Sequence, residues 1–367
     1  MRGHRHRPLR DRLPQPGGAC PARRRLSKRH RQGRPPLGQG LEAVRARVGL
    51  VGLGYWGPNL ARNLDQLAEL AWLCDIDPGA VERYAARYPK ARGTTEPERL
   101  LEDPGLDAVV IATPVPTHYQ LARQALLAGK HVLVEKPPAM TAAEIEELVS
   151  LAEQRDLVLM PGHLLLYHPG IRKLKDLIDA GELGEVLCIY GNRQNLGIIR
   201  QNESALWSLG VHDLSVILHL LDEEPEEAIA LGRDFLTPGV EDVVFCYLRF
   251  PSGKIAHMHL SWLDPHKMRR ITVVGTEKMA VFDDMELERK VTVYEKAPWK
   301  RAESYGEWQT RSGDIYIPKV ATDEPLKLEC EHFLRLIAGD GDRRKVARDG
   351  AMVVRALERL ERSLRGR

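Results

Sequence analysis

The first half of the folded chain alternates between short apolar runs and helical patterns. Residues 48–51 form a nearly continuous apolar run, and Leu60, Leu64 and Leu67 follow at the spacing of one helix face. Runs of this kind are typical of parallel strands that are buried on both faces of a sheet. The unit recurs as strands at 70–74, 107–112, 131–135 and 157–160, and as helices at 81–88, 119–127 and 141–154. Strands alternating with helices predict a doubly wound parallel sheet of the α/β class.

Beyond residue 184 the pattern changes to short strands with few helices between them. Turn sequences at 251–253 and 275–278 separate neighbouring strands as in β-hairpins, so we expect an open, mainly antiparallel sheet in an α+β domain. Helices are expected on one face of this sheet and at the end of the chain. The expected strands lie at 185–190, 228–231, 243–250, 255–262, 271–274, 280–282 and 291–294, and the helices at 205–221, 325–337 and 351–364.

The start of the chain differs from the rest in charge. The first 47 residues contain 14 lysines and arginines against two acidic residues and show no apolar periodicity, so we expect disorder. A basic arm for nucleic acid or an anionic surface is one hypothesis. We favour an inert tail, or an untranslated stretch with Val44 as the true first residue. We expect a tail at 1–46, a dinucleotide-binding domain at 47–165 and a substrate-binding and oligomerisation domain at 166–367.

The composition, with 43% hydrophobic and 29% charged residues among 367, is that of a globular protein with more than one domain. No run of about 18 apolar residues could span a bilayer, and the tail lacks the apolar segment of a secretory signal. Five irregularly spaced cysteines argue against a disulfide framework. His257 and His259 alternate on one strand, but a zinc ion would need a further ligand. We therefore expect a cytoplasmic protein whose body binds no metal, membrane or nucleic acid.

A glycine-rich turn follows the first predicted strand. Its sequence is Gly52-Leu53-Gly54-Tyr55-Trp56-Gly57. Gly52 permits a tight turn, Gly54 lets backbone N–H groups approach a pyrophosphate, and Gly57 allows the next helix to pack closely on the strand. Asp75 ends the second predicted strand, near the spacing expected of a carboxylate that binds a ribose. Together these features predict a Rossmann domain that binds a dinucleotide through all six residues of the turn and Asp75.

The residues around Asp75 favour NAD over NADP. A carboxylate accepts a hydrogen bond from the 2′-hydroxyl of NAD, whereas it repels the 2′-phosphate of NADP. The next three residues, Ile76-Asp77-Pro78, supply no lysine or arginine that could neutralise such a phosphate. We therefore predict NAD as the cofactor.

A lysine is expected at the edge of the sheet where the cofactor binds. The strand at 131–135 ends in Glu135 and is followed by Lys136 and two prolines, and ligands of open α/β sheets bind beyond the carboxyl ends of the strands. Pro137 favours an extended backbone at Lys136. An ammonium group here can donate a hydrogen bond to a substrate oxygen or stabilise a developing alkoxide. We predict that Lys136 is catalytic and contacts the substrate.

Several motifs together resemble the glucose-fructose oxidoreductase / inositol dehydrogenase / MocA-type oxidoreductase family. They are the glycine turn with Asp75, Ala112-Thr113-Pro114 with His118, the stretch GKHVLVEKP at 129–137, and Gly210-Val211-His212-Asp213. The resemblance runs from about residue 48 to the C-terminus. It implies NAD-dependent oxidation of a CH–OH group, and a homo-oligomer, dimer or tetramer, that packs through the open face of the second sheet. It also implies that Thr113, His118, Glu135 and Lys136 contact the cofactor.

A narrower resemblance lies in the stretch 193–213 and in Glu324-Pro325-Leu326, which opens a helix containing Glu331-His332-Phe333. These sequences are similar to those of bacterial UDP-N-acetylamino-sugar 3-dehydrogenases, which act on UDP-N-acetylglucosamine or its glucuronate in cell-surface polysaccharide synthesis. The resemblance implies a nucleotide-sugar substrate oxidised at its C3 hydroxyl. An inositol or free-sugar dehydrogenase and a non-catalytic NAD-binding regulatory protein are the alternatives.

His212 is the candidate general base. It interrupts an apolar helix, where a histidine is more often structural, but oxidation of an alcohol needs a group that takes up the hydroxyl proton near neutral pH. Many relatives have an Asp one helical turn earlier, where this chain has Ser208, whose hydroxyl cannot stabilise an imidazolium as a carboxylate does. The difference affects either the strength of the base or the identity of the residue that orients it.

Five further residues are candidates for the substrate site. His163 and Tyr167 follow the last strand of the first domain, near the expected nicotinamide edge, with packing at the domain junction as the alternative. Arg193, Asn195 and Arg200 could bind the UDP or the sugar, because guanidinium groups match phosphate and amides bind hydroxyls. A solvated surface loop is the alternative for these three.

Overall fold

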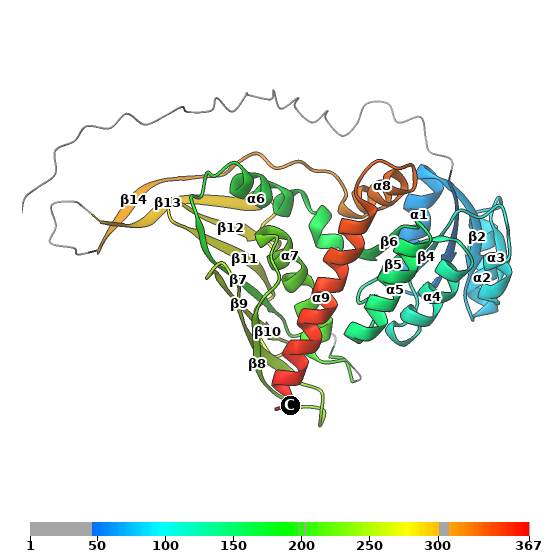
Figure 1. The fold of residues 1–367 in the computed structure, drawn as a ribbon, viewed down its shortest axis with the longest axis horizontal. Helices are drawn as coiled ribbons and strands as arrows, with labels where there is room; N and C mark the ends of the chain where they lie inside the picture. Colours follow the sequence, from blue (N-terminus) through cyan, green and yellow to red (C-terminus); the bar gives the residue numbers. More distant parts are fainter. Residues whose placement is uncertain (1–45, 198, 202, 301–307, 367) are drawn as a thin grey trace, which may run out of the picture. The chain divides into compact units, whose positions relative to one another are not determined.

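The computed structural model describes residues 46–197, 199–201, 203–300 and 308–366 (Figure 1). The predicted disorder of the tail at 1–46 falls almost wholly outside these residues and stays a prediction.

The first half of the chain forms a six-stranded parallel sheet in the order β3-β2-β1-β4-β5-β6. Its elements are β1 (Arg47–Val51), α1 (Gly57–Leu67), β2 (Glu69–Cys74), α2 (Pro78–Arg87), β3 (Arg92–Thr94), α3 (Pro97–Leu101), β4 (Ala108–Ile111), α4 (His118–Leu127), β5 (His131–Glu135), α5 (Ala142–Gln154) and β6 (Leu159–Gly162). Val48 and Leu50 of β1 are fully buried, as expected for strands covered on both faces. The predicted doubly wound sheet is confirmed, and the short strand β3, which has no apolar run, is an addition to it.

The second half forms an eight-stranded sheet in the order β14-β13-β12-β11-β7-β10-β9-β8. Its elements are a short 3-10 turn η2 (Leu164–Tyr167), α6 (Pro169–Asp179), β7 (Val186–Gln194), a π-helical turn η3 (Leu206–Gly210), α7 (Val211–Leu221), β8 (Glu227–Arg233), β9 (Val243–Arg249), β10 (Ile255–Ser261), β11 (Met268–Gly275), β12 (Met279–Asp283), β13 (Val291–Lys300) and β14 (Trp308–Tyr316). Only the pair of β7 and β10 is parallel, so the sheet is mainly antiparallel, as predicted.

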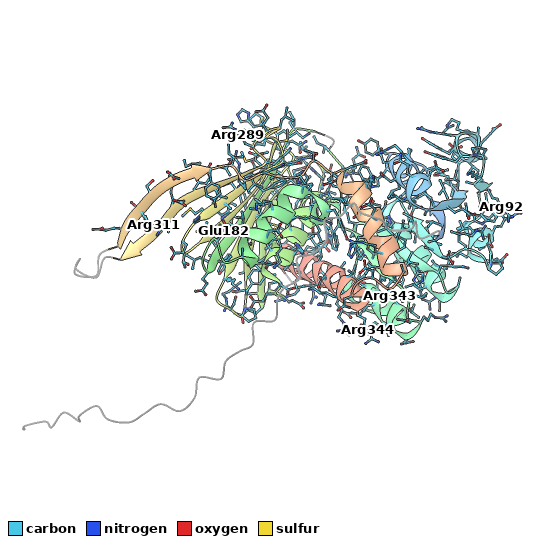
Figure 2. All side chains as sticks on the ribbon, turned by 90° about the horizontal axis from the view of Figure 1, so that it is seen from above. Arg92, Glu182, Arg289, Arg311, Arg343 and Arg344 are labelled. Carbon is cyan, nitrogen blue, oxygen red and sulfur yellow. The ribbon has the colours of Figure 1, made fainter. Side chains whose placement is uncertain are left out.

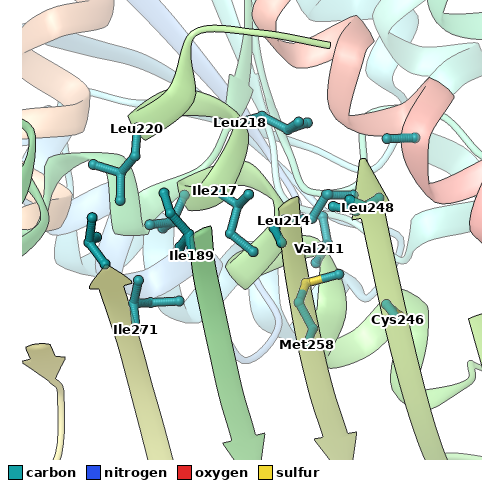
Figure 3. Packing of buried hydrophobic residues seen from close by; sticks show 14 of the residues in the cluster. Ile189, Val211, Leu214, Ile217, Leu218, Leu220, Cys246, Leu248, Met258 and Ile271 are labelled. Atoms are coloured by element: carbon teal, nitrogen blue, oxygen red, sulfur yellow. The ribbon is translucent and has the colours of Figure 1, made fainter. Parts of the chain in front are cut away.

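Helix α7 packs its apolar residues onto one face of this second sheet. Figure 3 shows Leu214 and Ile217 of the helix above Ile189 of β7 and Met258 of β10. All four side chains are essentially inaccessible to solvent. Burying such a surface contributes roughly 25 cal/mol per Å² of apolar area, and it fixes the start of α7, where His212 lies, against the sheet.

The two C-terminal helices join the two sheets. Helix α8 (Pro325–Ile337) packs against α1, and its Phe333 belongs to the same buried cluster as Leu50 and Leu60 of the Rossmann domain. At the N-terminus of α8, Glu324 accepts hydrogen bonds of 3.2 Å from both Arg62 and Asn63. Helix α9 (Arg343–Leu364) contacts α5 and β6 of the first sheet and α7 and β8 of the second (Figure 1). The C-terminal segment, expected to belong to the second domain alone, therefore completes the core of the first domain as well.

Exposed charged side chains lie on both halves of the described chain. Arg92, Glu182, Arg289 and Arg311 are exposed, and Figure 2 shows Arg92 on the first half and the other three on the second. Of the helices within the described residues, none combines the length and the apolar character that crossing a membrane requires.

Candidate active site

The glycine turn has the geometry that the sequence predicts. Gly52 has φ of 101°, and a Cβ atom there would lie 2.5 Å from the carbonyl oxygen of Ala112. A Cβ atom at Gly57 would lie 2.0 Å from the carbonyl oxygen of Gly52, so the first turn of α1 needs glycine to approach β1. Around Gly54 no atom lies within 4 Å of the position of a Cβ atom. The backbone of Gly54 is therefore open to a ligand at the N-terminus of α1, which fits the pyrophosphate of a dinucleotide.

Asp75 is bound to the glycine turn. Its Oδ2 accepts a hydrogen bond of 2.6 Å from the backbone N–H of Leu53, and its Oδ1 accepts one of 2.9 Å from the backbone N–H of Asp77. Each carboxylate oxygen keeps a further lone pair for a ribose hydroxyl. The nearby Arg83 lies 3.8 Å from Asp77, with which it forms an ion pair. The turn and Asp75 thus form one preorganised unit that suits the adenosine half of NAD.

His118 connects the Thr-Pro turn after β4 to the segment that follows β5. Its ring nitrogens lie 2.7 Å from the carbonyl oxygen of Thr113 and 2.8 Å from that of Pro137, and the side chain is almost fully buried. Burial lowers the pKa of His118. The hydroxyl of Thr113 is hydrogen bonded to that of Thr117 at 2.7 Å. The ring of His118 is thus engaged within the chain and positions the turns at the sheet edge. Contact of Thr113 and His118 with the cofactor stays a prediction.

Lys136 is half-buried at the end of β5, with charged groups of both signs around it. Burial lowers the pKa of its ammonium group, while the negative charges of Glu203 and Glu135 oppose this shift. Arg200 and Arg193 lie near enough to lower the pKa further. The pKa of the Lys136 ammonium group therefore depends on burial and on these four neighbouring charges.

His212 lies in the first turn of α7, directly after the π-helical turn η3, a distortion that is frequent at functional sites. Burial lowers the pKa of its imidazole well below the usual 6.5, and the charge of Lys136 lowers it next. Arg193 and Arg269 act in the same direction. The fold thus brings the ammonium of Lys136 and the imidazole of His212, 76 positions apart in the sequence, into one neighbourhood. It keeps the imidazole neutral near neutral pH.

Asp213 has a partner that the sequence did not indicate. Its Oδ1 accepts a hydrogen bond of 2.7 Å from Nε of Arg193 and lies 2.6 Å from Nη2 in the same ion pair, and both residues are buried. Asp213 is the residue next to His212 in α7, and Arg193 lies in β7, so the ion pair fixes the start of the helix on the sheet. Arg193 is therefore bound within the chain, and its contact with substrate stays a prediction. Ser208, also buried, is part of η3.

His163 and Tyr167, predicted together, occupy different surroundings. His163 is buried, its Nε2 has no hydrogen-bond partner within the described residues, and burial together with the charge of Lys136 lowers its pKa to about 4. Tyr167 is buried in the Rossmann core, and its hydroxyl lies 2.8 Å from Nδ1 of His332 in α8. The charge of Lys136 thus reaches His163, whereas Tyr167 packs in the core and contacts α8, and contact of either residue with substrate stays a prediction.

The segment after β7 brings Arg200 and Glu203 toward Lys136. Arg200 forms an ion pair with Glu203 at 3.4 Å, and the charges of both change the pKa of Lys136. Asn195 donates its backbone N–H to the carbonyl oxygen of Ser261 at 3.1 Å, which continues the sheet by one residue. Glu203 was not predicted, although its position three residues after Arg200 is a common spacing for an ion pair.

Other histidines lie on the opposite face of the second sheet from α7. His257 stacks on Tyr190, with ring centroids 4.9 Å apart, and His259 stacks on Phe245 at 4.3 Å. Among the residues that the structure describes, no group of three or more histidine, cysteine or acidic side chains is arranged to hold a metal ion.

Comparisons with known proteins agree with this geometry. A family model described as "Oxidoreductase family, NAD-binding Rossmann fold" matches residues 46–163, and one described as "GFO/IDH/MocA C-terminal domain" matches residues 171–281. The chain is 27% identical over 305 residues to scyllo-inositol 2-dehydrogenase (NAD(+)) of Bacillus subtilis, covering 79% of this chain and 86% of that protein. It is also 27% identical over 243 residues to UDP-N-acetylglucosamine 3-dehydrogenase of Acidithiobacillus ferrooxidans, covering 65% and 74% of the two chains.

Solved structures have the same fold over almost their whole length. UDP-N-acetylglucosamine 3-dehydrogenase GnnA from Acidithiobacillus ferrooxidans superposes with a TM-score of 0.74 at 26% identity, covering 87% of this chain and 97% of the other. GenD2 from gentamicin A biosynthesis, solved in complex with NAD, gives a TM-score of 0.73 at 26% identity, with 90% and 97% covered.

Proposed function

Since this chain belongs to the GFO/IDH/MocA family of NAD-binding oxidoreductases, we propose that it oxidises the C3 hydroxyl of a UDP-N-acetylamino sugar with NAD. The observation that supports this most directly is the convergence of Lys136 and His212 at the sheet edge where the cofactor turn lies. UDP-N-acetylglucosamine and its glucuronate are the substrates that we favour. The product would enter cell-surface polysaccharide synthesis in the cytoplasm.

His212 takes up the hydroxyl proton in this proposal. Because burial and the surrounding cations keep the pKa of its imidazole well below 6.5, the ring is neutral at neutral pH and offers a lone pair. A base with so low a pKa is weak. Lys136 offsets this weakness because its ammonium group donates a hydrogen bond to the same substrate oxygen and stabilises the developing negative charge. NAD, when bound, supplies the acceptor for the hydride that leaves the same carbon.

Several cationic groups lie near the two proposed catalytic residues and would favour an anionic substrate, although Arg193 pairs with Asp213 and Arg200 pairs with Glu203. Lys136, Arg193 and Arg269 lower the pKa of His212, and Arg200 lowers that of Lys136. A diphosphate adjacent to the sugar would be attracted by such a site. We propose that Arg200 and Asn195 bind the nucleotide-sugar, that His163 contacts the sugar through its unpartnered Nε2, and that Arg193 acts through Asp213.

Calorimetry and turnover separate the candidate substrates. We expect UDP-N-acetylglucosamine or its glucuronate to bind to the NAD-loaded protein and to produce NADH, which absorbance measures directly. Arg200→Gln should weaken the binding of the UDP-sugar, while Arg289→Gln, on an exposed turn away from the site, should not. NADH formation from inositol without affinity for any UDP-sugar would instead establish the alternative that the inositol dehydrogenase relative favours. NAD binding with no turnover of either class would favour a regulatory protein.

The face of the second sheet opposite to α7 is proposed as the surface of a homo-oligomer. Leu231 and Phe245 are register partners there and are exposed, and His259 is the register partner of Phe245 on the other side. Contiguous exposed apolar side chains on an open sheet are typical of a protein interface. Leu231→Glu with Phe245→Glu should convert a dimer or tetramer to a monomer in sedimentation measurements. An unchanged sedimentation coefficient would contradict this.

A further inference from the structure

An arginine that the sequence did not indicate lies close to the proposed catalytic base. Arg269, in β11, is the register partner of Arg193 in β7, so the two side chains start from neighbouring strands about 4.8 Å apart. Arg193 is hydrogen bonded to Asp213, which directly follows His212 in α7. Arg269 therefore lies one strand away from the residue that holds the start of α7 on the sheet.

The alternation of side chains along β11 places Arg269 on the face of the sheet that α7 covers. Ile271, two residues later, is buried in the cluster that α7 forms with this sheet. Its register partner in β7 is Gly191, where a Cβ atom would lie 2.8 Å from Oδ2 of Asp213. The carboxylate of Asp213 thus lies over the same strands. Burial is the main cause of the low pKa of His212, and the charge of Arg269 contributes to it.

The charge of Arg269 is only partly compensated. Its Nη1 donates a hydrogen bond of 3.3 Å to Oδ2 of Asp284, which is the one hydrogen bond of this guanidinium group within the described residues. The Oδ1 of Asp284 lies 3.8 Å from the ammonium of Lys290 and 3.6 Å from Nε2 of His168. One carboxylate therefore faces the positive charges of both Arg269 and Lys290, and 42% of the Arg269 side chain is exposed.

Arg193 and Arg269 differ in what their guanidinium groups can still bind. That of Arg193 is buried against Asp213, whereas that of Arg269 has further N–H donors, because a guanidinium group carries five and Asp284 accepts one. Planar guanidinium groups bind carboxylates through two parallel hydrogen bonds. Like charges on directly opposite residues destabilise a sheet. An anion bound at Arg269 would therefore also reduce the repulsion between the two arginines.

The position of Arg269 suits the sugar and not the nucleotide. The segment that carries Asn195 and Arg200 continues from β7 beside β10, because Asn195 donates its backbone N–H to the carbonyl oxygen of Ser261. In the order of the sheet, β11 flanks β7 on the other side. A substrate whose nucleotide lies along that segment would hold its sugar at His212 and turn the far side of the sugar ring toward β11.

We propose that Arg269 binds a C6 carboxylate of the sugar and thereby selects UDP-N-acetylglucosaminuronate over UDP-N-acetylglucosamine. This rests on the proposed function. Asp284, with Lys290 and His168 around it, holds the guanidinium group in place. The carboxylate is remote from the C3 carbon that is oxidised, so its contact with Arg269 contributes to the binding of substrate and not to the chemical step.

Calorimetry of the NAD-loaded chain with both nucleotide sugars tests this assignment. We expect the wild type to bind UDP-N-acetylglucosaminuronate roughly tenfold more tightly than UDP-N-acetylglucosamine, the usual contribution of a hydrogen bond between charged groups. In Arg269→Gln the preference should fall to within about twofold, with the affinity for UDP-N-acetylglucosamine little changed. Arg269→Lys should keep part of the preference, because an ammonium group retains the charge but not the paired donors.

Arg270→Gln is the matched control on the same strand. As the next residue along β11, Arg270 points to the opposite face of the sheet, and it pairs with Asp283 at 2.7 Å as Arg269 pairs with Asp284. Its loss removes the same charge from the same strand and should leave the ratio of the two affinities at the wild-type value. The unfolding temperatures of both variants should stay close to that of the wild type, because the two side chains are 42% and 45% exposed.

Steady-state kinetics separate a role in binding from a role in catalysis. Arg269→Gln should raise KM for UDP-N-acetylglucosaminuronate roughly tenfold and change kcat little. An equal loss of affinity for both nucleotide sugars would assign Arg269 to the diphosphate and overturn the proposal. A wild-type chain that binds both with equal affinity refutes this inference alone. Failure of both to bind refutes the proposed function, and the inference with it.

Discussion

The ion pair of Arg193 with Asp213 and the lone carboxyl group of Glu329 are both buried, and they differ in how their charge is compensated. Arg193 and Asp213 have opposite charges, are nearly inaccessible and are joined by a hydrogen bond of 2.7 Å and an ion-pair contact of 2.6 Å. Glu329 has no such partner, because neither of its carboxyl oxygens is hydrogen bonded within the described residues. The ion pair holds α7 on β7, although burial raises the pKa of Asp213 and its Oδ2 has no hydrogen-bond partner within the described residues. Burial raises the pKa of Glu329 well above its usual value.

The largest expected effect comes from breaking the buried ion pair of Arg193 and Asp213. Asp213→Ala leaves the buried guanidinium of Arg193 without its partner, and such changes destabilise proteins by about 3–5 kcal/mol. Denaturant unfolding measures this loss. The double variant Arg193→Met with Asp213→Leu removes both charges and should recover most of the stability, because well-packed apolar residues often replace a buried ion pair at little cost. A loss below about 1 kcal/mol in Asp213→Ala would mean that the pair does not hold α7.

Removing the side chain of Lys136 or of His212 should lower the rate of turnover and leave the fold unchanged. Lys136→Ala and His212→Ala should each lower kcat by roughly 10²-fold, in line with the contribution of a positioned acid or base. Dissociation constants for NAD, measured by fluorescence, should stay close to the wild-type value. Lys327→Ala, which removes an exposed lysine of α8, is the control for loss of one positive charge. Near-normal turnover in either site variant would exclude that residue as catalytic.

A smaller effect is expected when the ion pair of Arg193 and Asp213 keeps both charges but loses the donor geometry of the guanidinium group. Arg193→Lys retains the positive charge but replaces the two donors that reach Asp213 by a single ammonium, which should cost about 1 kcal/mol of unfolding free energy. The pH dependence of kcat should not change, because a cation still lowers the pKa of His212. Denaturant unfolding and the pH profile together test this. A shifted profile would show that Arg193 does more than compensate Asp213.

The parts of the fold that were predicted depend on neighbours in the sequence. The strands around Val48 and Val110, the helix after Gly57 and the capping box at Thr141 all have local signals, and each lies where it was expected. Strand β3 and strand β14 were not predicted, because the first has three residues without an apolar run and the second alternates polar residues at the edge of the sheet.

The surroundings of the candidate residues were predicted less well. Tyr167 was named on its position after β6, and its hydroxyl in fact meets His332, 165 residues later. Arg193 was predicted to bind the UDP or the sugar through its guanidinium group, which within the fold donates a hydrogen bond to Asp213. Glu329 was not predicted to be a special residue, because one glutamate among several in an amphipathic helix has no distinguishing sequence pattern. Each of these contacts joins residues that only the packed fold brings together.

The sequence by itself determined the Rossmann topology, the glycine turn and the preference for NAD, and it predicted Lys136 and His212 as the residues that assist NAD in oxidising an alcohol. These depend on local geometry: a positive φ at Gly52, a carboxylate at the end of a strand, and an ammonium at a sheet edge. Only the tertiary structure decided the protonation states of His212, Glu135 and Glu329. A pKa depends on burial and on charges within a few ångströms, and those neighbours come from β5, β7, α7 and α8, which are distant along the chain.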